Sequence, residues 1–183
     1  EHAQARSHKL LEARFSPYHQ QSPFHPVADL LLQMTGVRKE ASTAMRRAGL
    51  DRLLTKHKIP GADALSAMGS FLGIEPDEAA STRPASPDQQ RQTVLESLLG
   101  ILVGMAADCP VLLVCEDLHW ADPSTLELLR LLVGQVPAAR IFVLLTARPT
   151  FIQPWPARTY ATQLSLEPFT QAQTELMVSM LTG

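Results

Sequence analysis

Two acidic residues, Glu116 and Asp117, directly follow a run of five apolar residues at 111–115. Such a run predicts a strand that is buried on both faces of a parallel sheet. In open α/β sheets, ligands bind at the carboxyl ends of the strands, where this pair is expected. Carboxylates at such a place can hold a divalent cation or orient an attacking water. Because Mg²⁺ takes oxygen ligands and keeps several waters, one or two carboxylates at a strand end are sufficient for it.

Two other interpretations of the pair remain open. In one, Glu116 only ends the strand and Asp117 only accepts backbone bonds in a turn. In the other, His119 and Asp122 join the pair as metal ligands, which would make an independent Mg²⁺ or Mn²⁺ hydrolase. Asp122 is better placed as a helix cap, however, and no second His or Cys group lies at the ligand spacing of a zinc site. Trp120 is expected to be an apolar plug under the loop.

The elements on either side of the pair should hold it at the edge of a sheet. Asp122 can be the N-cap and Pro123 the first residue of a helix that ends at Gly134. An apolar run at 141–146 predicts a second strand. Strand, helix and strand within about 35 residues form a βαβ unit, whose strands should be parallel and whose crossover should be right-handed.

The rest of the chain is predicted to be mainly helical. Ser86 and Gln89 have the spacing of a capping box, which should begin a long helix. The predicted elements are a strand at 9–15, a helix begun by Ser22 and Pro23 and stopped by Gly36, short amphipathic helices over 37–72 broken at Pro60 and Gly61, a flexible surface loop at 75–87, a helix at 87–107, a short strand at 163–166 and a closing helix at 171–181.

Composition limits the class of protein. At 183 residues with 45% apolar residues, the chain fits roughly one domain with its own core. Its net charge of −2 provides no field that would attract nucleic acid or an anionic membrane, so neither is expected as a direct partner. No stretch approaches the roughly 20 apolar residues that cross a bilayer. Cys109 and Cys115 are interpreted as reduced core residues, which indicates a cytoplasmic protein.

The residues that follow the acidic pair make a motif match much more specific than the pair alone does. The apolar run followed by EDLHWADPSTLELL (residues 116–129) resembles the Walker B motif of AAA-type, STAND-like P-loop ATPase regions in bacterial signalling proteins. Such regions lie beside class III nucleotide cyclase domains or in large transcriptional regulators with helical repeats. Residues 15–22 and the Pro-Val-Ala-Asp-Leu-Leu helix after them are similar to the segment that follows the first P-loop helix there. The resemblance spans nearly the whole chain and is densest over 86–148.

The resemblance implies a role for each site residue. In the Walker B segment 111–117, Glu116 would bind Mg²⁺ and Asp117, a second metal-site carboxylate, would orient or deprotonate the water. The segment 141–148 would carry sensor 1, where Thr146 contacts the nucleotide and Arg148 reaches its terminal phosphate. Glu116 stands where the family often has Asp, and Ala147 stands where it often has an aromatic residue.

The phosphate-binding loop is absent from this sequence. No G-x-x-x-x-G-K-[ST] occurs, and none of the nine glycines is followed by Lys. In the resembled family that loop precedes the strand matched here by residues 9–15, so we expect it upstream of Glu1. Residues 1–183 would then form a partial P-loop ATPase domain, an incomplete three-layer α/β fold whose parallel sheet lacks its central strand. Either the strand at 163–166 pairs with 141–146, or that edge stays open and the chain self-associates.

The functional expectation follows from the same resemblance. The complete protein would bind ATP with Mg²⁺, hydrolyse it slowly and act as a switch for neighbouring cyclase, DNA-binding or helical-repeat domains. Both cofactors would require the upstream loop, so this segment should not hydrolyse ATP alone. The alternative is a degenerate, non-hydrolysing scaffold that serves for oligomerisation.

Overall fold

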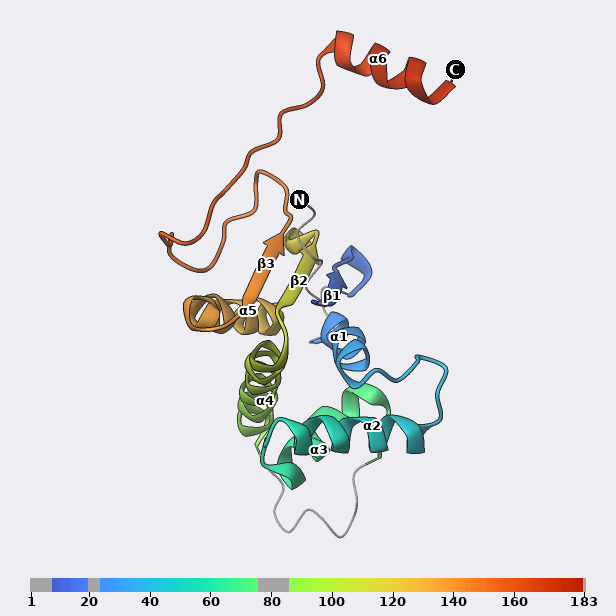
Figure 1. Cartoon of the computed structure of the whole chain (residues 1–183), viewed down its shortest axis with the longest axis vertical. Helices are drawn as coiled ribbons and strands as arrows, with labels where there is room; N and C mark the ends of the chain where they lie inside the picture. The colour runs from blue at the N-terminus through green and yellow to red at the C-terminus, as the bar shows by residue number, and fades with distance from the viewer. Residues whose placement is uncertain (1–7, 20–23, 76–85, 183) are drawn as a thin grey trace, which may run out of the picture.

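The computed structural model describes residues 8–19, 24–75 and 86–182. Figure 1 shows a small sheet, helices packed beneath it and a C-terminal helix that stands apart. The elements in chain order are β1 (Lys9–Arg14), a 3-10 turn (Pro17–His19), α1 (His25–Thr35), α2 (Thr43–Lys56), α3 (Gly61–Gly69), a 3-10 turn (Ser70–Leu72), α4 (Pro87–Asp108), β2 (Val111–Glu116), a 3-10 turn (Leu118–Trp120), α5 (Pro123–Gln135), a 3-10 turn (Val136–Ala138), β3 (Ile141–Leu145) and α6 (Gln171–Thr182).

The three strands form one parallel sheet in the order β1-β2-β3. In the register of the ladder, Leu11 lies beside Leu113, which lies beside Val143. The strands predicted at 9–15, 111–115 and 141–146 and the parallel βαβ unit of β2, α5 and β3 are therefore confirmed. Because all three strands run the same way, their carboxyl ends meet at one edge of the sheet.

The two faces of the sheet differ in burial. Leu11, Leu113 and Ile141 belong to the hydrophobic core, together with side chains of α1, α4 and α5. On the opposite face Leu10 is 44% and Phe142 66% exposed. Burial in β2 alternates between buried and half-buried positions, so the prediction of a strand buried on both faces is wrong for the part of the chain that the structure describes. Of the three layers expected, the described residues provide the sheet and one helical layer.

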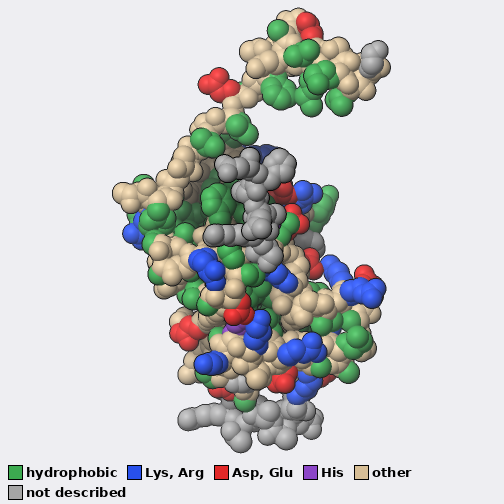
Figure 2. Space-filling model, in the orientation of Figure 1, with side chains coloured by type: hydrophobic (Ala, Val, Ile, Leu, Met, Phe, Trp, Pro, Cys, Tyr) green, Lys and Arg blue, Asp and Glu red, His purple; other side chains and the backbone are tan. Residues whose placement is uncertain are grey.

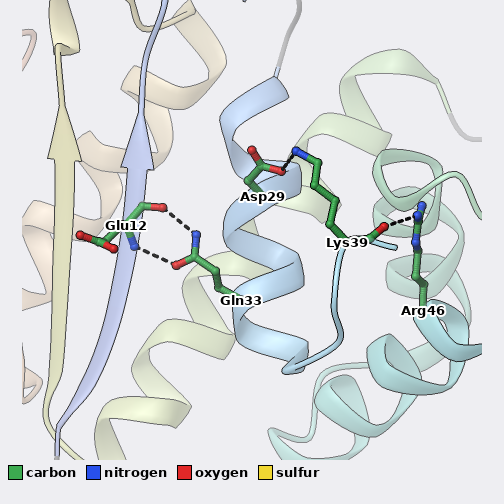
Figure 3. Close-up of polar contacts among 5 residues, drawn as sticks. All are labelled: Glu12, Asp29, Gln33, Lys39 and Arg46. Carbon is green, nitrogen blue, oxygen red and sulfur yellow. Dashed lines mark hydrogen bonds and ion pairs between the residues drawn. The ribbon is translucent and has the colours of Figure 1, made fainter. Parts of the chain in front are cut away.

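The two edges of the sheet differ as well. The side-chain amide of Gln33 in α1 pairs with both backbone groups of Glu12 at the outer edge of β1 (Figure 3). It accepts from the Glu12 amide at 2.9 Å and donates to the Glu12 carbonyl at 2.7 Å. An ion pair of Lys39 with Asp29 at 3.0 Å and a bond from Arg46 to the Lys39 carbonyl hold the loop after α1. The β1 edge is thus capped by a side chain, whereas no described strand pairs with the outer edge of β3.

The chain after β3, residues 146–182, forms a C-terminal arm that differs from two predictions. Residues 163–166 are not a strand: they form extended chain, and Leu166 is 91% exposed. A short run with two leucines has no ladder partner here, because α6 and the chain before it extend away from the sheet (Figure 1). The helix predicted at 171–181 is confirmed as α6, but it does not close the domain, since none of its described residues is buried. Figure 2 shows apolar side chains gathered along α6.

The helices follow their local signals. Ser86 Oγ accepts from the Gln89 amide at 3.3 Å and Gln89 Oε1 accepts from the Ser86 amide at 2.9 Å, so the capping box at the start of α4 is confirmed. Helices α2 and α3 are separated at Pro60, as predicted. Helix α1 begins at His25 and ends at Thr35, and Gly36 caps it with a φ of 70°, which favours glycine. Ser22, Pro23 and residues 76–85 of the predicted loop lie outside the described residues, and Pro87 belongs to α4.

The two cysteines differ in burial. Cys115 is buried in β2, as predicted, but Cys109 is half-buried at the end of α4 and is not a core residue. Both thiols are free. In the described part of the chain, none of the helices has the length and apolar character needed to cross a membrane.

Candidate functional site

The chain turns sharply where β2 ends. Glu116 is the last residue of the strand, and Asp117 has left-handed backbone angles of φ 62° and ψ 42°. Aspartate tolerates this region better than most residues do, because its short polar side chain can bond locally. The turn leads into the 3-10 segment Leu118–Trp120, where the Trp120 amide donates to the Asp117 carbonyl at 2.9 Å. Both carboxylates therefore lie at the carboxyl edge of the sheet.

Thr146 joins this turn to the end of β3. The Asp117 amide donates to Thr146 Oγ1 at 3.1 Å, and the Leu118 amide donates to the Thr146 carbonyl at 2.9 Å. The Thr146 amide in turn donates to the Cys115 carbonyl at 2.9 Å and continues the ladder by one bond. The structure thus brings together Asp117 and Thr146, which are 29 residues apart in the sequence.

The first acidic residue already has a partner that the sequence analysis missed. Arg14, at the end of β1, lies beside Glu116 in the register of the sheet. Its Nε donates to Glu116 Oε2 at 2.6 Å, and its Nη2 forms an ion pair with the same oxygen. The hydrogen bond with Glu116, followed by the carboxylate charge, raises the pKa of the Arg14 guanidinium. Both side chains are partly exposed, so the ion pair contributes little to stability.

This ion pair lines an open groove of about 630 Å³ between β1 and α1. Other charged residues on its walls are Glu12, Asp29 and Lys39. The only sequence signal for Arg14 is its alternation with buried Leu11 and Ala13 along β1, which places it on the exposed face. Its contact with Glu116 depends on strand order, which local patterns do not specify.

The carboxylates of Asp117 and Glu116 differ in their bonding partners. Asp117 is exposed, and within the described ranges its carboxylate has no hydrogen bond or ion pair, whereas Glu116 is held by Arg14. Exposed carboxylate oxygens at a strand end fit Mg²⁺, which needs few protein ligands. The residues present therefore fit the metal, but the sequence contains no amide cradle for the phosphates of a nucleotide.

Asp122 is committed to α5. Its side chain is 3% exposed and accepts from the amides of Ser124 at 3.0 Å and Thr125 at 3.1 Å and from the Thr125 hydroxyl. The predicted N-cap is thereby confirmed. Among residues 8–19, 24–75 and 86–182, no three or more His, Cys, Asp or Glu side chains gather in a way that could hold a metal ion. The alternative of a hydrolase built on Glu116, Asp117, His119 and Asp122 therefore has no assembled metal site there.

A stack of side chains lies next to the acidic turn. The guanidinium carbon of Arg148 is 5.7 Å from the centroid of the Trp120 ring, at cation–π distance. The His119 ring lies 4.9 Å from the Trp120 ring, tilted by 48°. Both nitrogens of His119 are buried and have no hydrogen-bond partner among the described residues. Trp120 is half-buried and packs against the core, as expected of an apolar plug, and its ring also faces Arg148.

Comparison with known proteins adds the family. The model of the AAA ATPase domain matches residues 1–145. An uncharacterized protein of Rhizobium meliloti (strain 1021) is 22% identical over 174 residues, which cover 95% of this chain and 17% of the relative. The chain thus spans about a sixth of that relative's length. No solved structure matches the chain.

Proposed function

Because this chain belongs to the AAA ATPase domain family, a class of nucleotide-binding modules, we propose that it carries the hydrolytic half of an ATP-dependent switch. The observation that supports this most directly is the bond from the Asp117 amide to the Thr146 hydroxyl. It places the ends of two neighbouring parallel strands, and the polar groups on them, at one edge of the sheet. Ligands of open α/β sheets bind at that edge.

We assign a role to each side chain at this edge. Glu116, which now bonds Arg14, would hold Mg²⁺, and the ion would neutralise charge on the phosphates. Asp117, which is exposed and unbonded among the described residues, orients or deprotonates the attacking water. Thr146 keeps the turn in place and presents its hydroxyl to the nucleotide. Arg148 stabilises the charge that develops on the terminal phosphate.

The proposal requires a phosphate cradle, which this sequence does not contain. Phe142 and Leu144 are exposed on the sheet face, and the outer edge of β3 has no partner among the described strands, while the β1 edge is capped by Gln33. We propose that a preceding segment supplies the phosphate-binding loop and pairs its strand with β3. The large share of the relative that lies outside the match is consistent with a longer protein. Cyclase, DNA-binding or helical-repeat domains of such a cytoplasmic protein would receive the signal.

The test compares this chain with a version extended upstream by about 60 residues, the length of a strand, loop and helix with its connections. Binding of a fluorescent ATP analogue and release of phosphate are measured with and without Mg²⁺. We expect slow, Mg²⁺-dependent turnover by the extended protein only. Arg148→Ala should lower turnover, whereas Arg158→Ala, at an exposed arginine further along the arm, should not. An extended protein that binds no nucleotide would refute the proposal.

The exposed apolar groups support a second candidate, a non-hydrolysing oligomerisation scaffold. Phe142, Leu144 and the apolar side of α6 are uncovered, and Glu116 is neutralised by Arg14. The scaffold predicts that the extended protein self-associates without binding nucleotide. Sedimentation of the extended protein, with and without Mg-ATP, separates the two candidates: ATP-dependent association favours the switch.

A further inference from the structure

We propose that Trp120 is a positioning residue for Arg148. This inference rests on the proposed function, in which Arg148 acts on the terminal phosphate. It starts from the contact itself: the guanidinium lies over the face of the Trp120 ring, 5.7 Å from the ring centroid. The negative face of an indole attracts a cation more strongly than any other side chain's ring does.

Arg148 needs such a partner because little else orients it. It lies on the exposed segment after β3, and no ion pair holds its guanidinium in the described part of the chain. A free arginine side chain samples many rotamers, and fixing them at the moment of reaction costs entropy. A planar guanidinium that already lies on an aromatic face has lost part of that freedom. The ring therefore prepares Arg148 before the phosphate arrives.

Trp120 is held firmly enough to do this. Its amide donates to the Asp117 carbonyl at 2.9 Å, the next amide, of Ala121, donates to Leu118 at 3.0 Å, and Leu118 is buried. The His119 ring packs beside the indole. The ring thus belongs to the same rigid turn as the water-orienting carboxylate of Asp117.

The contact of Trp120 with Arg148 also links the acidic turn to the segment that follows β3. The acidic turn and the sensor segment are tied through the backbone and side chain of Thr146 and also through the stack of Trp120 and Arg148. Because both ties join the same two segments, a shift of Arg148 toward the phosphate is transmitted to the turn that carries Asp117. Trp120 then sets the geometry of the reaction without touching the nucleotide.

The contact can be tested in this chain without nucleotide. Trp155→Phe leaves Trp120 as the single tryptophan, because the chain has two. We expect Arg148→Met, which removes the charge but keeps the length, to change the emission and acrylamide quenching of Trp120, whereas Arg158→Met leaves them unchanged. Identical emission with Arg148→Met would overturn the inference. If Trp155→Phe does not fold, the same comparison is made with both tryptophans present.

The positioning role is tested by turnover in the extended protein. Trp120→Leu should lower kcat by about two- to fivefold, the factor expected for an exposed cation–π contact, and leave KM for ATP unchanged. Trp120→Phe should restore most of the loss. In the Arg148→Ala background, Trp120→Leu should have no further effect. An unchanged kcat, or the same loss in both backgrounds, refutes the positioning role alone, whereas no turnover by the unaltered extended protein refutes the proposed function.

Discussion

Replacing Asp122 by alanine should unfold the start of α5 and destabilise the protein substantially. The carboxylate is 3% exposed, and it accepts from the amides of Ser124 and Thr125 and from the Thr125 hydroxyl. Losing an N-cap costs about 1 kcal/mol. The Thr125 hydroxyl, itself buried, loses its partner and costs roughly 1–3 kcal/mol more. Asp122→Ala should therefore lower the free energy of unfolding by about 2–4 kcal/mol.

The assay is urea denaturation of this chain followed by circular dichroism, with Asp122→Asn as the matched control. The asparagine oxygen can still cap the helix and its amide can still bond the Thr125 hydroxyl, so most of the stability should remain. Denaturation is repeated with EDTA and with Mn²⁺. A loss below about 0.5 kcal/mol for Asp122→Ala, within the range of ordinary surface substitutions, would refute the cap as the role of this side chain. A loss that appears only with metal would show that Asp122 is a ligand.

Three further outcomes are expected from the packing and the titrating groups. A Cβ on Gly104 would lie 2.6 Å from Nδ1 of His57, so Gly104→Ala should lower the free energy of unfolding by about 1–3 kcal/mol, measured by urea denaturation. A Cβ on Gly134 meets nothing within 4 Å, so Gly134→Ala should raise the free energy of unfolding by up to about 1 kcal/mol. The reverse order would contradict this packing. Burial lowers the pKa of His57, and the charge of Lys56 lowers it further. The unfolded chain therefore binds the proton more readily than the folded chain. The stability that neutral His57 contributes is fully present above pH 6.5 and is lost as the pH falls through the lower pKa of the folded state. Midpoints at pH 7.5 and 5 should therefore differ less in His57→Gln than in the unaltered chain, and equal differences would be inconsistent with the shift. Burial raises the pKa of Cys115 to about 12, so a thiol reagent at pH 8 should label Cys109 alone in the folded protein and both cysteines in urea; two labels without urea would show that β2 is open.

Local sequence signals predicted the elements around the site well. The capping box of Ser86, the cap at Asp122 and the apolar runs of β2 and β3 all act within a few residues, so the sequence contains the whole interaction. The prediction of a strand at 163–166 was wrong because a strand depends on a partner that is distant in the sequence. Its two leucines fit a strand locally, but a strand exists only where a neighbour completes its ladder, and no described strand lies beside it.

The contacts that define the site depend on strand order and were harder to predict. Arg14 and Glu116 are 102 residues apart, and they meet because β1 pairs with β2. The stack of Arg148 on Trp120 likewise requires β3 beside β2 and the left-handed turn at Asp117. The motif resemblance pointed to Glu116, Asp117, Thr146 and Arg148 as candidate site residues, but it gave no sign that Glu116 would be held by a cation or that Arg148 would lie on a ring.

The most direct test of the central claim is to measure Mg-ATP binding and single-turnover hydrolysis by the extended protein with Asp117→Asn. The account predicts an unchanged Kd and a rate lower by a factor of about 100 or more, because the asparagine cannot take a proton from the water. Hydrolysis at the rate of the unaltered protein would contradict the catalytic role of Asp117.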